Sequence, residues 1–269
     1  MSGMTGTLRL VLGLDGAGRC AFRENYSTQL HRVLHLVPGA VPEEGVVYVL
    51  NPTGGVLQGD VLEADIRVEA GAHAIVTTPS ATKIHRMDGR QAVSRTRLRV
   101  ASGSILEYVP EPVIPFAGSR YIEDVSIDVD AGGKLLAWEI LAPGRQARGE
   151  VFDYDHLGLR LRLAEDGVVV LRERADLRPR EEAFGALSMG DATHYGVLMA
   201  LGGDPERLVE AIRPLTEPFS AGVTRLPGTG VVVKMLAGQG RDIEAVFGRI
   251  RERAVAELAG RPATRLRTT

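Results

Sequence analysis

Apolar and polar residues alternate along most of the first two thirds of the chain. From Val61 to Glu69 apolar side chains alternate with charged ones, and residues 93–100 and 121–129 repeat the pattern. A period of two is typical of a strand with one buried and one solvated face. Such runs follow one another at short intervals, separated by turns such as Ala70-Gly71, which predicts a hairpin into a second strand at 72–78.

The pattern changes to a helical period only near the C-terminus. Asp204-Pro205-Glu206 combines a capping side chain, a proline suited to the first helical position and an early acid. A second apolar stripe at helical spacing runs from about Asp242 to Leu258. We therefore expect a mainly β, large antiparallel scaffold, built as a sandwich or as helix-like stacked sheets, with two helices in the C-terminal third.

Length and composition favour one domain. The 269 residues, 44% of them hydrophobic, are enough for a substantial core, which we place in a single β-rich domain at 7–260. Residues 1–6 are expected to fray and 261–269 to form a flexible tail. A single cysteine, Cys20, excludes an intramolecular disulfide, and neither a signal peptide nor an apolar run of membrane length is found. These features predict a cytoplasmic protein without a membrane partner, and the net charge of -2 gives no reason to expect nucleic acid.

Four carboxylates occupy positions that are unusual for acids. Glu139 lies in an apolar strand, Glu173 ends an apolar run between two arginines, Asp60 closes a glycine-rich turn and Glu150 follows Gly149. A buried carboxylate must be paired, protonated or bound to metal. The four could therefore line an interior passage for a divalent cation held loosely by oxygen. Alternatively each makes a salt bridge or accepts from backbone donors, and the residues alone support this structural interpretation better.

No enzymatic motif is present. The chain contains no phosphate-binding loop, serine elbow, zincin pattern or cysteine pair, so no catalytic residue and no firm metal ligand is assigned. His31 and His35 would be about 13 Å apart on a strand, too far for one ion. A metal-dependent hydrolase and a β-type binding module remain alternatives, although 5% aromatic residues are few for stacking on sugars.

One stretch and several later segments resemble a known family. Residues 110–116, PEPVIPF, residues 135–139, LLAWE, and residues 148–150, RGE, support the likeness. The main motif residues are Asn51, Pro52, Gly54, Gly55, Gly59, Asp60, Thr77, Thr78, Thr82, Lys83 and Arg86. Over roughly residues 8–260 the chain resembles the urease accessory protein UreD family, also called UreH.

The resemblance implies a non-catalytic chaperone. It implies a scaffold that binds urease apoprotein and, with UreF and UreG, supports GTP-dependent delivery of nickel into the urease active site, with UreG as the GTPase. No cofactor would be tightly bound, and nickel would be in transit. The resemblance makes Asp60, Glu139, Glu150 and Glu173 candidates for a nickel passage.

Overall fold

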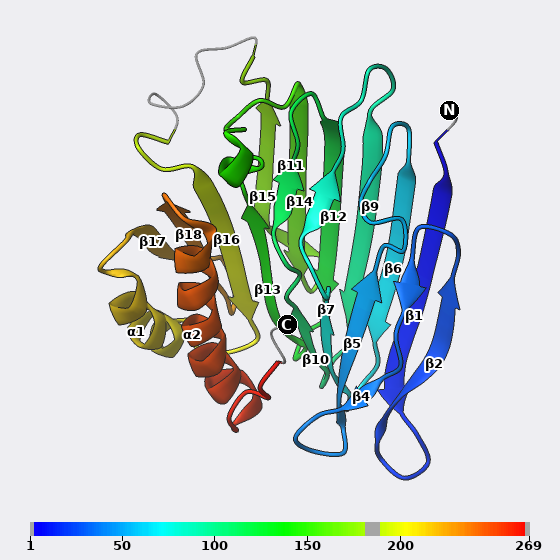
Figure 1. Cartoon of the computed structure of the whole chain (residues 1–269). Coiled ribbons are helices and arrows are strands. Elements are labelled where there is room, and N and C mark those ends of the chain that lie inside the picture. The colour runs from blue at the N-terminus through cyan, green and yellow to red at the C-terminus, as the bar shows by residue number, and fades with distance from the viewer. Residues whose placement is uncertain (1–2, 181–188, 267–269) are drawn as a thin grey trace.

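Two large β-sheets face each other in the computed structural model, which describes residues 3–180 and 189–266 (Figure 1). The seven-stranded sheet contains, in spatial order, β15 (Val168–Leu177), β14 (His156–Glu165), β12 (Arg120–Val129), β9 (Ala92–Val100), β6 (Val61–Val68), β1 (Thr5–Leu14) and β2 (Cys20–Ser27). The main path of the eleven-stranded sheet is β17 (Ser220–Arg225), β18 (Val231–Ala237), β16 (His194–Leu201), β13 (Lys134–Leu141), β10 (Ile105–Tyr108), β7 (His73–Thr77), β5 (Glu44–Leu50) and β3 (Arg32–Val33). Its short additional strands are β4 (Val37–Pro38), β8 (Thr82–Ile84) and β11 (Val113–Pro115).

In the central part of the fold the chain passes back and forth between the two sheets instead of forming hairpins. β6, β9, β12 and β14 lie in one sheet, and β7, β10 and β13, which alternate with them in the sequence, lie in the other. Neighbours in each series are parallel, as in the pairs Val61 with Val93 and Ala74 with Leu106. The mainly β class and the helix-like stacking of sheets are confirmed.

The expected antiparallel order is wrong for this central part. The turn at Ala70-Gly71 carries the chain from β6 to β7 in the opposite sheet, so β6 and β7 do not form the predicted hairpin. Parallel neighbours need such a crossover between them, and here the crossover is a strand of the facing sheet. Antiparallel pairs occur at the two ends, for example between β1 and β2 and between β14 and β15.

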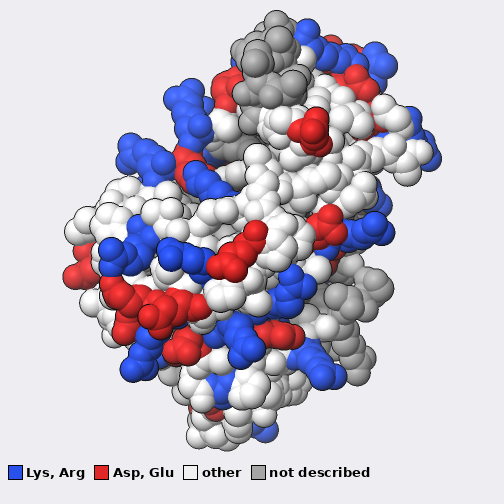
Figure 2. All heavy atoms as spheres, turned by 90° about the vertical axis from the view of Figure 1, so that its left-hand side faces the viewer, with Lys and Arg blue, Asp and Glu red and all other residues white. Residues whose placement is uncertain are grey.

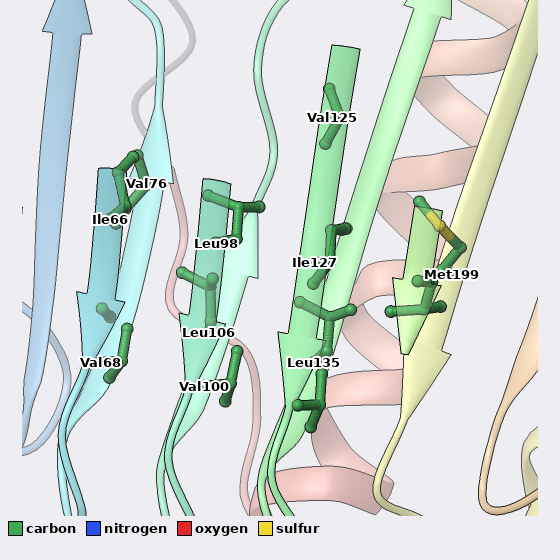
Figure 3. Close-up of a cluster of buried hydrophobic side chains, with 14 of the residues drawn as sticks. Ile66, Val68, Val76, Leu98, Val100, Leu106, Val125, Ile127, Leu135 and Met199 are labelled. Carbon is green, nitrogen blue, oxygen red and sulfur yellow. The ribbon is translucent and has the colours of Figure 1, made fainter. Parts of the chain in front are cut away.

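Apolar side chains from both sheets meet in the space between them. Figure 3 shows Val68 and Val100 from one sheet opposite Leu106 and Leu135 from the other. All four side chains are at most 1% exposed. This layer explains the period of two in the sequence, because every second residue of each strand points into it.

Two helices cover the outer face of the eleven-stranded sheet. α1 (Pro205–Thr216) begins where Asp204 accepts hydrogen bonds from the backbone N–H groups of Glu206 and Arg207, as the sequence predicts. α2 (Gly240–Ala259) packs Phe247 and its apolar neighbours on β13, β16 and β18. A single 3-10 turn, η1, spans Gln146–Arg148. Neither described helix is both long and apolar enough to cross a membrane.

Both ends of the described chain are anchored, unlike the expected boundaries. Thr5 and Gly6 already belong to β1, and the Met4 N–H donates to Asp60. Past α2, Arg261 and Thr264 are bonded to buried residues of β5 and β7, so residues 261–264 are not a free tail. Residues 1–2 and 267–269 lie outside the described part of the chain.

Candidate functional site

The layer between the sheets changes from apolar to polar along the strands. On β9 and β12 the inward positions are Leu98 and Ile127 in the apolar part. Toward the other end of the same face, β9 presents Ser94 and Thr96, and β12 presents Glu123, which pairs in register with Ser94. A sheet interior could be apolar throughout, so the polar part calls for a separate explanation.

A cavity of about 120 Å³, called here the chamber, occupies this polar part. It lies between Tyr121 and Glu123 on one sheet and Tyr108 and Glu139 on the other. Glu123 and Glu139 are deep in the protein yet keep some accessible surface, and both line the cavity. The chamber, which Glu111 also lines, therefore brings Glu123 and Glu139 into a space large enough for water or a small ion.

The chamber shares lining residues with two larger hollows. The cleft, about 910 Å³ between β15 and β17, is lined by Glu139 and Glu173. The α2 groove, about 520 Å³ beside α2, shares Thr77, Thr78 and Glu111 with the chamber. A line of polar side chains thus runs from the α2 groove through the chamber to the cleft.

Glu123 and Glu139 lack a cationic partner among the described residues. Oε1 of Glu139 is buried without a hydrogen-bond partner there. Burial, followed by the charges of Glu123 and Glu173, raises the pKa of Glu139 well above its usual value. Burial also raises the pKa of Glu123 to about 7. Near neutral pH the pair therefore retains protons that an entering cation could displace.

Glu173 stands at the mouth of the cleft and is paired. The Tyr195 hydroxyl donates to its Oε2 at 3.1 Å, and the Lys234 Nζ lies 2.5 Å from its Oε1. Lys234 comes from β18, so this ion pair bridges the two sheets. Of the four acids predicted to form a passage, the structure brings Glu139 and Glu173 together.

Asp60 and Glu150 have structural partners and line neither the chamber nor the cleft. Asp60 is 2% exposed and accepts from the backbone N–H groups of Met4 at 3.0 Å and Leu57 at 2.9 Å, which closes the turn before β6. Glu150 accepts from Arg145 Nε at 2.7 Å, and this hydrogen bond lowers the pKa of Glu150. For these two acids the alternative of a structural role is the one that the contacts support.

The family-like motif builds the turn and the end of the chamber. The Asn51 side-chain amide donates to the Gly55 carbonyl at 3.1 Å, and its oxygen accepts from the Thr53 N–H at 2.9 Å. Gly55 has φ 150°, and a Cβ there would lie 2.6 Å from the Lys83 carbonyl oxygen, so no side chain fits. The remaining motif residues divide into Asn51, Thr77, Thr78 and Thr82 on the chamber wall, Lys83 and Arg86 on the exposed surface, and Pro52, Gly54 and Gly59 in the turns.

Glu123 is the main site residue that sequence reasoning missed. It lies two residues from both Tyr121 and Val125, which face the core, so it is in phase with the apolar side of β12. An acid in phase with the buried positions of a strand is a signal that the sequence does contain. Glu111 was missed as well, and burial followed by the charge of Glu244 raises its pKa.

A second buried group of charges lies on the opposite, outer face of the eleven-stranded sheet. His73 Nε2 is 2.7 Å from Glu107 Oε1, and its Nδ1 is 3.2 Å from Glu44 Oε2. Arg251 of α2 pairs with Glu107 at 2.5 Å, and Arg261 pairs with Glu44. Burial tends to raise the pKa of Glu44, but hydrogen bonds from Thr264 and Arg261 outweigh it and lower this pKa below its usual value. Here each acid has its own guanidinium, which identifies a structural network.

No preformed metal centre is found in the described residues. They contain no group of three or more histidine, cysteine, aspartate or glutamate side chains arranged to hold an ion. The chamber lining offers three carboxylates, Glu111, Glu123 and Glu139, together with His31 and hydroxyl groups from threonine, serine and tyrosine. Such a set can hold a divalent cation only in part, with water completing its coordination.

Comparison with known proteins assigns the chain to a family. The family model described as UreD urease accessory protein matches residues 4–269. Urease accessory protein UreD of Haloarcula marismortui is 32% identical over 97% of this chain and 89% of its own length. The proteins of the same name from Mycolicibacterium gilvum and Cenarchaeum symbiosum are each 32% identical over 88% of this chain, covering 89% and 86% of their own lengths. The chain therefore belongs to the UreD family of urease accessory proteins.

Proposed function

We propose that this protein is a non-catalytic scaffold that binds urease apoprotein and, with UreF and UreG, supports GTP-dependent insertion of nickel into the urease active site. UreG is the GTPase in this proposal, because the chain itself has no phosphate-binding loop. The complex works in the cytoplasm. Nickel is the cargo and is not retained as a cofactor.

The observation that carries the proposal is the pair Glu123 and Glu139 in the chamber. Both are deeply buried, both line a cavity, and neither forms an ion pair with a described residue. Burying two unpaired acids side by side lowers stability, so a purely structural role gives no reason for them. A passing divalent cation provides the missing positive charge.

The sequence of cavities suggests how the cation moves. It enters from the α2 groove at Glu111, reaches Glu139 through the chamber, and leaves by the cleft at Glu173, or takes the reverse route. Carboxylates that hold protons near neutral pH release them when a cation binds and take them back when it leaves. Partial coordination keeps binding weak enough for release.

The test is co-expression of the urease genes with and without this chain, followed by purification of urease and measurement of its nickel content by mass spectrometry. We expect nickel-poor urease when the chain is missing, and UreF and urease to co-purify with a tagged copy when it is present. Expressed alone, the chain should behave poorly and give a low soluble yield, which co-expression with UreF should raise. A soluble chain that ignores UreF and leaves nickel loading unchanged would contradict the proposal.

The two alternatives have less support. A metal-dependent hydrolase needs about three convergent protein ligands, and the described residues contain no such group. A carbohydrate-binding module would present aromatic side chains for stacking, but Tyr26 is the one aromatic residue among the described exposed large hydrophobics. Neither alternative accounts for the acids in the chamber.

A further inference from the structure

The strand β15 forms an open edge of the seven-stranded sheet. Among the described residues it pairs only with β14, and β17 ends the facing sheet in the same way. The cleft lies between these two edges and is lined by Leu171 and Ala175 of β15 and by Ala221 of β17. Both edges are on the left side of Figure 1. An unpaired strand presents free N–H and C=O groups that another strand can bind.

On the outer face of the seven-stranded sheet, acidic and basic side chains alternate from one strand to the next until the edge strand β15. One row across the strands reads Glu63, Arg95, Asp124, Arg160, Arg174. Arg95 pairs with Glu63 at 3.4 Å, and Asp124 neighbours both Arg95 and Arg160 in register. At β15 the alternation ends, because Arg174 lies directly opposite Arg160.

The neighbouring row repeats the irregularity. Arg172 lies opposite Arg162, and only Arg162 has an acidic partner, Asp128 at 2.7 Å. Arg160, Arg172 and Arg174 are exposed and form no ion pair with any described residue. Like charges directly opposite each other on a sheet are destabilising. Figure 2, in which the left-hand side of Figure 1 faces the viewer, shows basic and acidic side chains interspersed with uncharged surface.

The edge strand β15 also exposes large apolar side chains. Val168, at the start of β15, is 64% exposed, and Val169 is 39% exposed. They are two of the few large apolar side chains exposed on the described part of the chain. Together with the arginines they give β15 a surface that is both apolar and positively charged.

We propose that β15 accepts an additional strand from a partner protein, and that this strand carries acidic side chains at alternate positions. When a strand is added, every second one of its side chains lies on the outer face, next to Arg172 and Arg174. Acidic side chains at these positions continue the rows of alternating charge. Its other side chains point toward the cleft and meet Leu171 and Ala175. Backbone hydrogen bonds supply affinity, and the charges supply specificity.

The same arginines argue against a second copy of this chain as the occupant. Pairing two β15 strands about their centres would bring Arg172 and Arg174 of one copy against those of the other. Charged residues on edge strands commonly prevent such self-pairing. An acidic strand is attracted by the feature that repels the copy. If the proposed nickel route is also right, the added strand lies beside Glu173 at the mouth of the cleft.

The test measures binding of a fluorescent peptide that alternates glutamate with valine and threonine to the full-length protein, without metal. The variant Arg172→Glu/Arg174→Glu is compared with Arg95→Glu/Arg97→Glu, which reverses two exposed arginines in the middle of the same face. We expect the edge variant to weaken binding about tenfold or more and the central variant to leave it nearly unchanged. A lysine version of the peptide should prefer the edge variant.

A second peptide separates strand addition from simple charge attraction. N-methylation of alternate backbone amides removes the donors that face β15 but keeps every charge, and we expect it to abolish binding. Equal binding of the methylated peptide, equal binding by both variants, or no binding by the wild-type protein would each overturn the proposal. Since the experiment contains no nickel, its failure would leave the proposed nickel route standing, and the reverse also holds.

Discussion

Acidic side chains are buried on both faces of the eleven-stranded sheet, but only one face supplies them with partners. On the outer face, Glu107 is paired with Arg251 and Glu44 with Arg261, and His73 lies between the two acids. On the inner face, Glu139 lies near Glu123 with no described cation beside either. The first arrangement is what stability requires of buried charge.

The difference shows how to separate structural acids from functional ones. The sequence alone gives both groups the same appearance, because each acid lies on a strand among apolar residues. The partner distinguishes them: a guanidinium in one case and a cavity in the other. Asp60 and Glu150 belong with the structural acids, because Asp60 accepts from two backbone N–H groups and Glu150 has the Arg145 guanidinium as its partner.

The largest effect is expected from removing a guanidinium on the outer face. Arg251→Met leaves Glu107, which is fully buried, without its cation, and should lower the free energy of unfolding by roughly 3–5 kcal/mol. Urea denaturation followed by circular dichroism measures the change. Arg253→Met, at an exposed position of the same helix, is the control and should change stability by less than about 0.5 kcal/mol. Equal effects would mean that the network is not structural.

The pH dependence of stability tests the acids on the inner face of the eleven-stranded sheet. Glu123 has its pKa raised to about 7 by burial, from 4.5 in the unfolded chain, so the folded protein keeps a proton that the unfolded chain loses. The stabilising contribution is complete below about pH 4.5 and is lost as the pH rises through about 7. Glu123→Gln should remove it, changing the slope of stability against pH by at most about 1.4 kcal/mol per pH unit in that window.

The measurement is the difference between variant and wild-type unfolding free energies across the window. The difference cancels contributions of carboxylates that do not interact with Glu123, such as Glu44, whose lowered pKa acts with the opposite sign. It retains the change at Glu139, whose pKa is raised in part by the charge of Glu123. Glu252→Gln, an exposed acid on α2, is the control. Parallel curves for Glu123→Gln and wild type would show that Glu123 titrates normally.

Several parts of this architecture could be predicted from the sequence, because their signals lie within short segments of the chain. The alternation around Ile66 predicts a strand, and the cap at Asp204 predicts the start of α1, because both signals depend on neighbouring residues. Glu139 could be identified as buried because Leu135 to Leu141 is apolar on both faces. Each of these predictions needs only a short window of the chain.

The parts that could not be predicted depend on pairing between distant segments. A strand such as β6 shows the same period of two whether its neighbour is parallel or antiparallel, so the order of the sheets was missed. The pair Arg251 and Glu107 joins residues 144 positions apart. The separation of Asp60 and Glu150 from the chamber likewise depends on where the turns place them, which no local pattern reveals.

A moderate loss of stability is expected at Asp60. Asp60→Ala leaves the part-buried N–H groups of Met4 and Leu57 without their acceptor and should cost about 1–3 kcal/mol. The control is Asp88→Ala, because Asp88 pairs with Arg86 on the exposed surface, where an ion pair contributes little. Thermal unfolding of the two variants gives the comparison. Unchanged stability of Asp60→Ala would argue that this acid has a role other than closing the turn.

The smallest effect is expected at Glu150. Its partner Arg145 also stacks on Phe116, 4.1 Å from the ring centre, so Arg145 remains held when the acid is removed. Glu150→Gln should therefore cost no more than about 1 kcal/mol in a chemical denaturation experiment. A loss several times larger would mean that the pair supports more of the fold than its contacts indicate.

Nickel loading by the double variant Glu123→Gln/Glu139→Gln tests the central claim most directly. Glutamine keeps the shape of both side chains but cannot take a negative charge, so the chamber stays folded and loses its attraction for a cation. The measurement is the amount of nickel per urease active site, made after co-purification of the complex has been confirmed. Urease matured with this variant should contain far less nickel than urease matured with Glu150→Gln. Full nickel loading by an assembled double variant would contradict the account and make the chamber acids structural.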